Sequence, residues 1–400
     1  MKTILLYAAY TDQMSYYDDW TDAFLEHKNF HTEAINVCGQ TCDFKLVTKR
    51  LETAELVVLH HSMNGDTLEY LKPFISPLKN RRGKLVSFVG NEVNLPTMSM
   101  KEKIKSLKDL DVDIIATQLL QEAGDWLYSD CSKSKIISIP HGLNPAIFSP
   151  DRSIKRKIDI GTRSARYGVY IGDNDRNQII QFFHKNAKQY NFSIDLGLEP
   201  GQQKRFNRAE WKHFLNSSVA TLSTEAGSFY LEKGDAIVHL ILKYLKKKSD
   251  KIVLPNEDIL RKYYRSIVPS PIRKKVINLL GGNIIESANI DESIDFEGIY
   301  EKFFLNAQKC PVYSKAISSR HFDAIGTKTL HIMYPGRYND ILIPGEHYFE
   351  LAKDHSNILD LKDLLENKQE VNNIVDRTYD YILSKHTHKH RLDAILQALF

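Results

Sequence analysis

Two glutamates near the middle of the chain are the first candidates for bond-making chemistry. Glu225 and Glu232 lie on either side of a Gly227-Ser228 pair, directly after an apolar run at 218–222 that predicts a strand. A carboxylate placed beside an electrophilic carbon can act as a nucleophile or as a general base. The segment therefore predicts a reactive loop, and a pair of solvated surface acids is the alternative interpretation.

A second polar cluster lies between residues 314 and 357. The pattern predicts a short helix over 320–325, ended by Gly326 and Thr327, and then a buried strand over 329–333. Helix N-termini, glycine turns and the carboxyl ends of parallel strands bind phosphate groups in α/β proteins. An ordinary buried β-α-β unit with a polar rim is the alternative. We predict a nucleotide site formed by Ser318, Ser319, Arg320, His321, Asp323, Gly326 and Thr327, with the Gly227-Ser228 pair beside it.

A pair of arginines follows another predicted strand, at 157–160. Arg163 and Arg166 lie in a loop that also contains Gly161. Guanidinium groups form charge-assisted hydrogen bonds with phosphates and carboxylates. We therefore expect this loop to contribute to the same nucleotide site, although a solvated surface arginine is a fair alternative for one of the two.

Polar side chains also end two strands predicted in the first part of the chain. His60, His61 and Asn64 follow the apolar run at 54–59, and Glu92 follows the run at 84–89. Ligands of open α/β sheets bind at the carboxyl ends of the strands. These residues are therefore the candidates for contacting a second substrate, the acceptor, while polar residues that simply end strands are the alternative for any one of them.

The elements that must position these residues alternate between strand and helix patterns. Apolar runs predict strands in the first part at 3–9, 54–59, 84–89, 113–116 and 135–139. Such alternation is typical of a parallel, doubly wound sheet. A linker rich in Pro and Gly at 139–150 leads to a second series of strands and helices. The sequence thus predicts an α/β protein with two Rossmann-like domains that face a cleft.

The predicted boundaries follow from this alternation. We expect an acceptor-side domain over residues 1–150 and a donor-binding domain over 151–385. The second domain is interrupted at about 235–304 by a stretch that the periodicity predicts to be helical. We expect the final segment, 386–400, to form a helix that crosses back to the first domain.

The interrupting stretch is strongly basic. Such a surface attracts anionic lipid headgroups or an anionic glycan, although a charge run is more often a solvated face. The basic residues are Lys243, Lys246, Lys247, Lys248, Lys251, Arg261, Lys262, Arg265, Arg273, Lys274 and Lys275.

Composition excludes several classes of protein. With 54 basic and 50 acidic residues among 400, the net charge of +4 is too balanced to predict a nucleic-acid partner. The first seven residues are too short and too quickly polar for a signal peptide, and no apolar run approaches the roughly 18 residues that span a bilayer. We expect a cytoplasmic protein, with contact to the inner membrane restricted to its surface.

The sequence offers little support for a metal site. Cys38 and Cys42 form a CxxxC pattern without a second pair, so free thiols in a reducing compartment are expected. The histidine-rich run at 386–391 has no interleaved carboxylate or cysteine and predicts the start of a helix. With no paired-aspartate metal motif either, we expect metal-independent chemistry in which cationic groups stabilise a leaving group.

Several spaced motifs together resemble a known family. They are Ser-Ser-Arg-His-Phe-Asp-Ala at 318–324, Gly-Thr-Lys-Thr at 326–329, Pro-Gly-Glu-His at 344–347 and His-Thr-x-x-His-Arg at 386–391. These motifs are similar to the donor-binding segment of B-type glycosyltransferases, particularly the spore-maturation-like group. Over its whole length the chain resembles the retaining β-Kdo transferase domain of bacterial O-antigen and capsule synthases, which serve lipopolysaccharide and capsule assembly.

The resemblance implies a donor, a mechanism and an acceptor. The donor would be CMP-Kdo, and a carboxylate would displace CMP in the first of two displacements. Glu232 matches the nucleophile position, where the family has Asp, and Asp323 matches a ribose-binding position, where the family has Glu. The acceptor would be a sugar hydroxyl of a lipid-linked O-antigen or capsule glycan. The chain would be one domain of a larger synthase.

Two other functions fit the same residues. A transferase that uses a UDP- or GDP-linked hexose would share the fold and the nucleotide helix. A glycan-binding module with a degenerate transferase fold would explain why Glu stands at position 232 in place of Asp.

Overall fold

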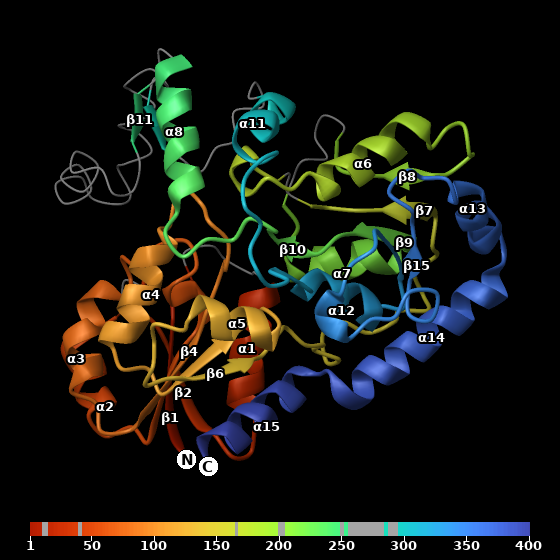
Figure 1. The fold of residues 1–400 in the computed structure, drawn as a ribbon. Coiled ribbons are helices and arrows are strands. Elements are labelled where there is room, and N and C mark those ends of the chain that lie inside the picture. Colours follow the sequence, from red (N-terminus) through yellow and green to blue (C-terminus); the bar gives the residue numbers. More distant parts are fainter. Residues whose placement is uncertain are drawn as a thin grey trace.

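The computed structural model of the chain contains two parallel β-sheets, each flanked by helices (Figure 1). The structure describes residues 1–9, 15–38, 42–164, 167–198, 205–248, 252–254, 284–286 and 295–400. Every strand pairing within the two large sheets is parallel. The predicted architecture of two α/β domains is therefore confirmed.

The first domain is built on a six-stranded sheet in the order β2-β1-β3-β4-β5-β6. Five of its strands coincide with the predicted apolar runs. The edge strand β2 escaped prediction because its sequence, HTEAIN, is polar and half-buried and shows no apolar run. The strands are β1 (Lys2–Tyr7), β2 (His31–Asn36), β3 (Leu56–Leu59), β4 (Lys84–Phe88), β5 (Ile114–Thr117) and β6 (Lys135–Ser138).

Helices cover both faces of this sheet and bury its aliphatic side chains. β3 and β5 are fully buried, as expected for central parallel strands that are covered on both faces. The helices are α1 (Ser15–Glu26), α2 (Phe44–Leu51), α3 (Ile75–Lys79), α4 (Met100–Asp109) and α5 (Gln121–Leu127), with short 3-10 turns η1 (His61–Met63) and η2 (Lys72–Phe74).

The second domain is built on a five-stranded sheet in the order β15-β14-β9-β7-β8. Its strands are β7 (Ile158–Gly161), β8 (Ile194–Asp195), β9 (Ser218–Ser223), β14 (Leu330–Met333) and β15 (Phe349–Glu350). Its helical elements are η3 (Val169–Ile171), α6 (Asp175–Asn186), α7 (Arg208–Asn216), α12 (Ser319–Gly326), η4 (Tyr338–Asp340), α13 (Ile358–Glu366) and α14 (Lys368–Lys385). A small antiparallel pair, β10 (Ala226–Gly227) with β13 (Lys315–Ala316), lies after β9.

The stretch predicted to be helical over 235–304 is only partly helical. It contains α8 (Ala236–Lys248) and α11 (Phe296–Phe303), but also a parallel pair of short strands, β11 (Ile252–Leu254) and β12 (Ile284–Glu286). The all-helical expectation is therefore wrong at those two strands, which are only three residues long and too short to show a period of two. Of the basic residues in this stretch, those at 251, 261, 262, 265 and 273–275 lie outside the described residues.

The last helix returns to the first domain. α15 (His388–Leu399) begins at Thr387, whose side chain accepts a hydrogen bond from the backbone N–H of His390. Leu392, Ile395 and Leu399 are buried in a cluster with Leu5 and Trp20 of the first domain. Figure 1 shows α15 lying against α1, with the two chain ends adjacent.

Candidate active site

The two sheets meet through the loops at their carboxyl ends. The side chain of Asn339, after β14, donates a hydrogen bond to the backbone carbonyl of Gln118, after β5, over 3.0 Å. Asn94, after β4, donates to the backbone carbonyl of Glu232 over 2.8 Å. Because ligands of open parallel sheets bind at the carboxyl ends of the strands, this junction is the candidate active site.

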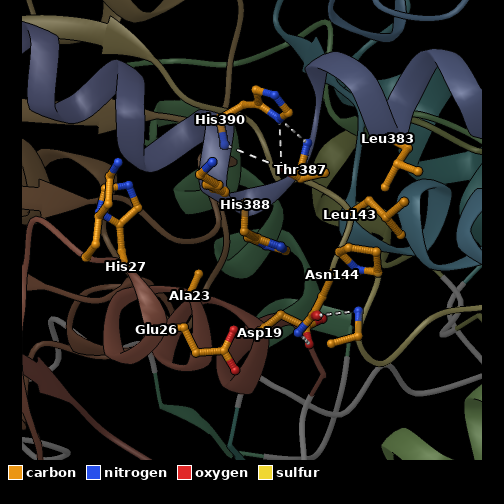
Figure 2. Close-up of a pocket in the computed structure, with 14 residues that line it drawn as sticks. Asp19, Ala23, Glu26, His27, Leu143, Asn144, Leu383, Thr387, His388 and His390 are labelled. Atoms are coloured by element: carbon orange, nitrogen blue, oxygen red, sulfur yellow. Dashed lines mark hydrogen bonds between the residues drawn. The ribbon is translucent and has the colours of Figure 1, made fainter.

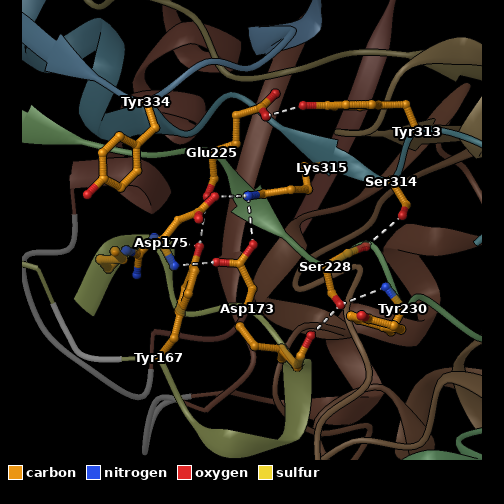
Figure 3. Close-up of polar contacts among 12 residues, drawn as sticks. Tyr167, Asp173, Asp175, Glu225, Ser228, Tyr230, Tyr313, Ser314, Lys315 and Tyr334 are labelled. Carbon is orange, nitrogen blue, oxygen red and sulfur yellow. Dashed lines mark hydrogen bonds and ion pairs between the residues drawn. The ribbon is translucent and has the colours of Figure 1, made fainter. Parts of the chain in front are cut away.

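A buried ionic cluster occupies the second-domain side of the junction (Figure 3). The ammonium group of Lys315 lies 2.7 Å from the carboxylate of Asp173 and 3.1 Å from that of Asp175. Burial alone would raise the pKa of Asp175, but Lys315 and Lys353 outweigh it and hold that pKa below its usual value. The loop between β7 and α6 is therefore fixed to β13 by charges that are satisfied within the protein.

Arg176 connects this cluster to the next strand end. Its guanidinium lies 3.7 Å from the ring centre of Tyr167 and donates a 2.6 Å hydrogen bond to the Tyr167 hydroxyl. That hydroxyl in turn donates to the backbone carbonyl of Glu225 over 3.1 Å. Burial lowers the pKa of Arg176 to about 10, with Tyr167 and Asp173 favouring the charged form and Arg320 opposing it, so the side chain stays charged at neutral pH.

The carboxylate of Glu225, one of the two predicted catalytic groups, is buried and hydrogen-bonded. It accepts from the hydroxyl of Tyr313 and, over 2.7 Å, from the backbone N–H of Tyr338. Burial raises its pKa, while Tyr313 and then Lys315 oppose the rise. A Cβ atom on Gly336 would lie 2.5 Å from the same carboxylate, so the close approach requires glycine there.

Glu232, the other predicted catalytic group, lies at the junction between the domains. Its backbone N–H and C=O both bond to the side chain of Asn94, each over 2.8 Å. Its carboxylate accepts from the backbone N–H of Ile237 over 3.0 Å, at the start of α8. The two glutamates therefore belong to separate networks, and their catalytic roles stay predictions.

The predicted nucleotide residues are distributed along α12. Ser318 caps the helix, and the Nδ1 atom of His321 lies 3.0 Å from its hydroxyl. Burial lowers the pKa of His321 well below its usual value, so the ring is neutral. Gly326 and Thr327 lie at the opposite end, about 10 Å along the helix axis. A Cβ on Gly326 would lie 2.6 Å from Leu143 and Phe148, so that end is packed against the linker.

Arg320 is the cation best placed for a ligand. It lies in the first turn of α12 and makes no hydrogen bond or ion pair with any residue that the structure describes. Its charge influences groups from both domains: it opposes protonation of His141 and of Arg176 and it favours the charged form of Asp323. Its donors are therefore available at the junction.

Asp323 lies one turn further along α12 and is fully buried. Its carboxylate accepts a 3.0 Å hydrogen bond from the indole N–H of Trp211. Burial raises its pKa well above the usual value, and Asp19 of the first domain adds to the rise. A ribose contact by Asp323, which stays a prediction, would compete with Trp211 for the same carboxylate.

The predicted arginine loop is engaged elsewhere. The guanidinium of Arg163 pairs with the carboxylate of Asp195 over 2.7 Å and lies 4.4 Å from the ring centre of Phe214. Phosphate binding by Arg163 would require this pair to open. Arg166 lies outside the described residues.

The predicted Gly227-Ser228 pair lies after β9. Gly227 adopts a φ of 98° in β10, and the buried hydroxyl of Ser228 donates a hydrogen bond to the backbone carbonyl of Ile171.

The predicted acceptor-side residues are buried at the ends of β3 and β4. Asn64 bonds to the backbone of Phe88 and Gly90, over 2.9 and 3.0 Å. Glu92 accepts from the Thr117 hydroxyl over 2.6 Å, from the Tyr128 hydroxyl over 2.7 Å and from the Gln118 N–H over 2.8 Å. In this structure both side chains fix the loops that shape the first-domain edge of the junction.

A buried group of histidines completes that edge. The ring of His61 stacks on His141 at 5.2 Å, and His141 accepts a 3.1 Å hydrogen bond from the indole N–H of Trp20. Burial is the largest cause that lowers the pKa of His60 and of His141 to about 3, and nearby charges add to it. These rings are neutral at physiological pH, and the edge carries no positive charge from them.

Sequence reasoning missed the ionic cluster and the part that His388 takes in the histidine group. Asp173 and Asp175 gave only the weak signal of a Gly-Asp pair in a loop after a strand, and Lys315 gave none. His388 lay in a run interpreted as a helix start, yet it reaches the ring of Trp20 at 4.7 Å. Long-range contacts of this kind leave no local pattern.

A separate cavity of about 480 Å³ lies behind the junction (Figure 2). It is bounded by α1, by the linker at 143–146 and by the start of α15. The carboxylate of Asp19 accepts from the side chain of Asn144 over 2.9 Å and pairs with Arg208 of the second domain. Burial raises the pKa of Asp19 to about 6. Asp19 thus joins the linker and the second domain beside this cavity.

Within the described ranges, no three or more His, Cys, Asp or Glu side chains are grouped so as to hold a metal ion. In the same part of the chain, none of the helices has the length and apolar character needed to cross a bilayer.

Comparisons with known proteins agree with the geometry of the fold. Residues 300–397, which include α12 and α15, match a family model described as glycosyl transferase-like. The structure is similar to that of Anabaena HepE in complex with UDP-glucose, with a TM-score of 0.53 at 9% identity, covering 100% of this chain and 99% of HepE. A glycosyltransferase from Rickettsia africae has a TM-score of 0.50 at 9% identity, covering 100% of this chain and 97% of the other. No curated protein matches the chain.

These findings define the fold. Two parallel-sheet domains that meet at their carboxyl edges, with a glycosyl transferase-like C-terminal segment, constitute the GT-B glycosyltransferase fold. The likeness to the solved structures extends over the whole chain, so the fold includes the first domain, which the family model does not reach.

The buried histidines predict how stability depends on pH. Burial lowers the folded-state pKa of His60 and of His141 to about 3 and that of His61 well below its usual value, whereas the unfolded-state values lie near 6.5. Only the unfolded chain binds protons between these values, so stability is complete above about pH 6.5 and falls as the pH decreases. Each such histidine contributes about 1.4 kcal/mol per pH unit. We expect His61→Phe, which removes one buried ring with an unpartnered Nε2, to make the fall shallower by about that amount.

Urea unfolding at pH 7.0, 6.0 and 5.0 measures this dependence. The matched control is His184→Gln, which replaces an exposed histidine and should leave the dependence of the unfolding free energy on pH unchanged. Equal dependence in the wild type and in His61→Phe would contradict the neutral, buried state of His61.

Proposed function

We propose that the chain is a glycosyltransferase that binds a nucleotide-activated sugar between its two domains and transfers the sugar to a glycan acceptor. The observation that carries the proposal is the N-terminal turn of α12, at the junction of the domains. The guanidinium of Arg320 lies beside it and makes no hydrogen bond or ion pair within the described part of the chain. The fold and the C-terminal family match support the same reaction class.

The nucleotide phosphate fits the start of α12 for electrostatic reasons. The first N–H groups of a helix have no partner within the helix, and the helix dipole places partial positive charge there. Arg320 adds a full charge with several donors in one plane, which suits a phosphate. In this proposal Ser318 and Arg320 contact the phosphate, Ser319 contributes its backbone, and Asp323 is the candidate for the ribose contact.

The proposal also names the sugar donor. The resemblance to β-Kdo transferase domains supports CMP-Kdo, and we take this donor as the first candidate. A UDP-linked sugar is the second candidate, because the similar structure of HepE was determined with UDP-glucose. Both nucleotides place phosphate at the same helix end, so Arg320 serves either donor.

Retaining transfer proceeds through two displacements in this proposal. The carboxylate of Glu232 attacks the anomeric carbon, and the bond from that carbon to the CMP phosphate oxygen breaks, leaving CMP with the electron pair. The acceptor hydroxyl then attacks the same carbon, Glu232 leaves as a carboxylate, and the hydroxyl proton passes to a base, for which Glu225 is the candidate. Asn94 places Glu232 at the junction through two backbone hydrogen bonds.

The acceptor would approach from the first domain, past His60, His61, Asn64 and Glu92. We propose a lipid-linked O-antigen or capsule glycan, with the protein peripheral to the inner membrane and part of a larger synthase. The exposed lysines Lys243 and Lys247 on α8 support contact with an anionic surface, in line with the basic composition of the following residues.

Nucleotide binding tests the donor part. We expect CMP to raise the thermal midpoint of the wild type more than UDP or GDP does, because only the best-bound nucleotide stabilises the folded state markedly. Arg320→Ala should weaken binding about tenfold to a hundredfold, since charge-assisted hydrogen bonds to a phosphate are lost. Isothermal titration with each nucleotide measures the affinity.

The control for this experiment is Arg377→Ala, which removes an exposed arginine whose guanidinium donates to the backbone carbonyl of Glu346. It should bind nucleotide as the wild type does. A larger shift with UDP than with CMP would favour the UDP-sugar donor. Unchanged affinity in Arg320→Ala would exclude the proposed phosphate position.

The nucleophile is tested by trapping the glycosyl–enzyme intermediate. Incubation with CMP-Kdo and no acceptor should add the mass of one Kdo residue to the intact protein, on the peptide that contains Glu232. Glu232→Gln should remove both the added mass and the transfer activity, because an amide is a far weaker nucleophile.

Glu122→Gln, which changes an exposed carboxylate on α5, is the control and should still form the adduct. Normal transfer by Glu232→Gln would show that another group, or a direct displacement, carries the reaction.

A further inference from the structure

Three consecutive residues after β14 adopt a backbone conformation that side-chain-bearing residues rarely use. Tyr338, Asn339 and Asp340 have φ angles of 45°, 54° and 56°. In this left-handed region the Cβ atom crowds the following carbonyl, and each such residue costs about 1–2 kcal/mol. A run of three therefore persists only because the surroundings hold it, and such strain gathers at functional sites.

Two contacts within the second domain hold this turn. The buried carboxylate of Glu225 accepts from the N–H of Tyr338 over 2.7 Å. The side-chain oxygen of Asn339 accepts from the N–H of Ile317 over 2.7 Å. Ile317 directly precedes Ser318, the cap of α12. The turn is thus connected to the end of the helix where the proposed nucleotide phosphate lies.

The third contact crosses to the first domain. The side-chain nitrogen of Asn339 donates to the backbone carbonyl of Gln118 over 3.0 Å. Gln118 is itself fixed, because its N–H donates to Glu92 and its side chain donates to the carbonyl of Val89, both over 2.8 Å. The neighbouring Arg337–Glu122 ion pair also crosses the junction, but it is exposed and therefore contributes little.

The two partners of Asn339 determine how its amide is oriented. An N–H group on one side requires the oxygen, and a carbonyl on the other side requires the nitrogen. Asn is also the residue, after glycine, that most readily adopts the left-handed conformation. Asn339 therefore tolerates the left-handed turn, and its side chain bonds both to the residue before α12 and to the first domain.

We propose that Asn339 is a positioning residue that couples the separation of the two domains to the placement of the donor helix. When the Asn339–Gln118 hydrogen bond forms, the edge of the first-domain sheet is held against the start of α12. The acceptor-side residues and the donor-binding residues are then held at a fixed distance from each other. The coupling to catalysis rests on the proposed glycosyl transfer, whereas the coupling of domain separation to Asn339 does not.

Two substitutions separate the two bonds of Asn339. Asn339→Asp keeps the oxygen that accepts from Ile317 but replaces the donor to Gln118 by an oxygen that faces a carbonyl. Asn339→Gly keeps the left-handed backbone at no steric cost but loses both bonds. Glu122→Gln is the control at the same junction and should resemble the wild type.

Small-angle X-ray scattering measures domain separation, calorimetry with CMP and UDP measures nucleotide affinity, and steady-state kinetics measures turnover. Asn339→Asp should broaden the distribution of domain separations and lower kcat about tenfold, with nucleotide affinity within about twofold of the wild type. Asn339→Gly should show the same broadening and, in addition, bind nucleotide about tenfold more weakly.

A scattering profile of Asn339→Asp identical to that of the wild type would overturn the inference, as would equal nucleotide affinity in the two variants. A wild type that transfers no sugar would refute the proposed function instead. The scattering comparison would still decide the role of Asn339, because it needs no turnover.

Discussion

The left-handed turn at Tyr338–Asp340 is the constraint on which the shape of the candidate site depends. It is strained, so it exists only while Glu225 and the backbone of Ile317 hold it. Glu225 can approach because residue 336 is glycine, and it is kept in place by Tyr313. Without this turn, the loop after β14 would not meet Gln118, and the junction would lose the hydrogen bond from Asn339 to Gln118. The carboxylate of Glu225, a candidate base, thus also stabilises the left-handed turn.

The two edges of the junction differ in charge, and the difference suits the proposed reaction. The first-domain edge is neutral where it is formed by His60, His61 and His141, because burial holds their pKa values far below neutrality. The second-domain edge carries Arg176, Lys315 and Arg320, of which Lys315 is balanced by Asp173 and Asp175. An anionic nucleotide is attracted to the second-domain edge. An uncharged sugar hydroxyl does not depend on such charges and can approach the neutral first-domain edge.

Much of the fold was accessible from the sequence, because its strands are buried on both faces and appear as continuous apolar runs, as in β3 and β5. The polar edge strand β2 and the two-residue pair of β10 and β13 lack that signal. The site was predicted where polar residues follow strands or open a helix, as Arg320 does. It was not predicted where partners are distant in sequence: Lys315 meets Asp173, and Asn339 meets Gln118, only after folding. Tertiary ion pairs and amide bridges have no local period, so no window of sequence reveals them.

The central claim is that a nucleotide sugar binds between the domains with its phosphate at the start of α12. A crystal structure of the chain with CMP or UDP bound tests this most directly. The account predicts phosphate oxygens within hydrogen-bond distance of the Arg320 guanidinium and of the backbone N–H groups that follow Ser318. A nucleotide bound instead in the cavity between α1 and α15, with Arg320 free, would contradict it.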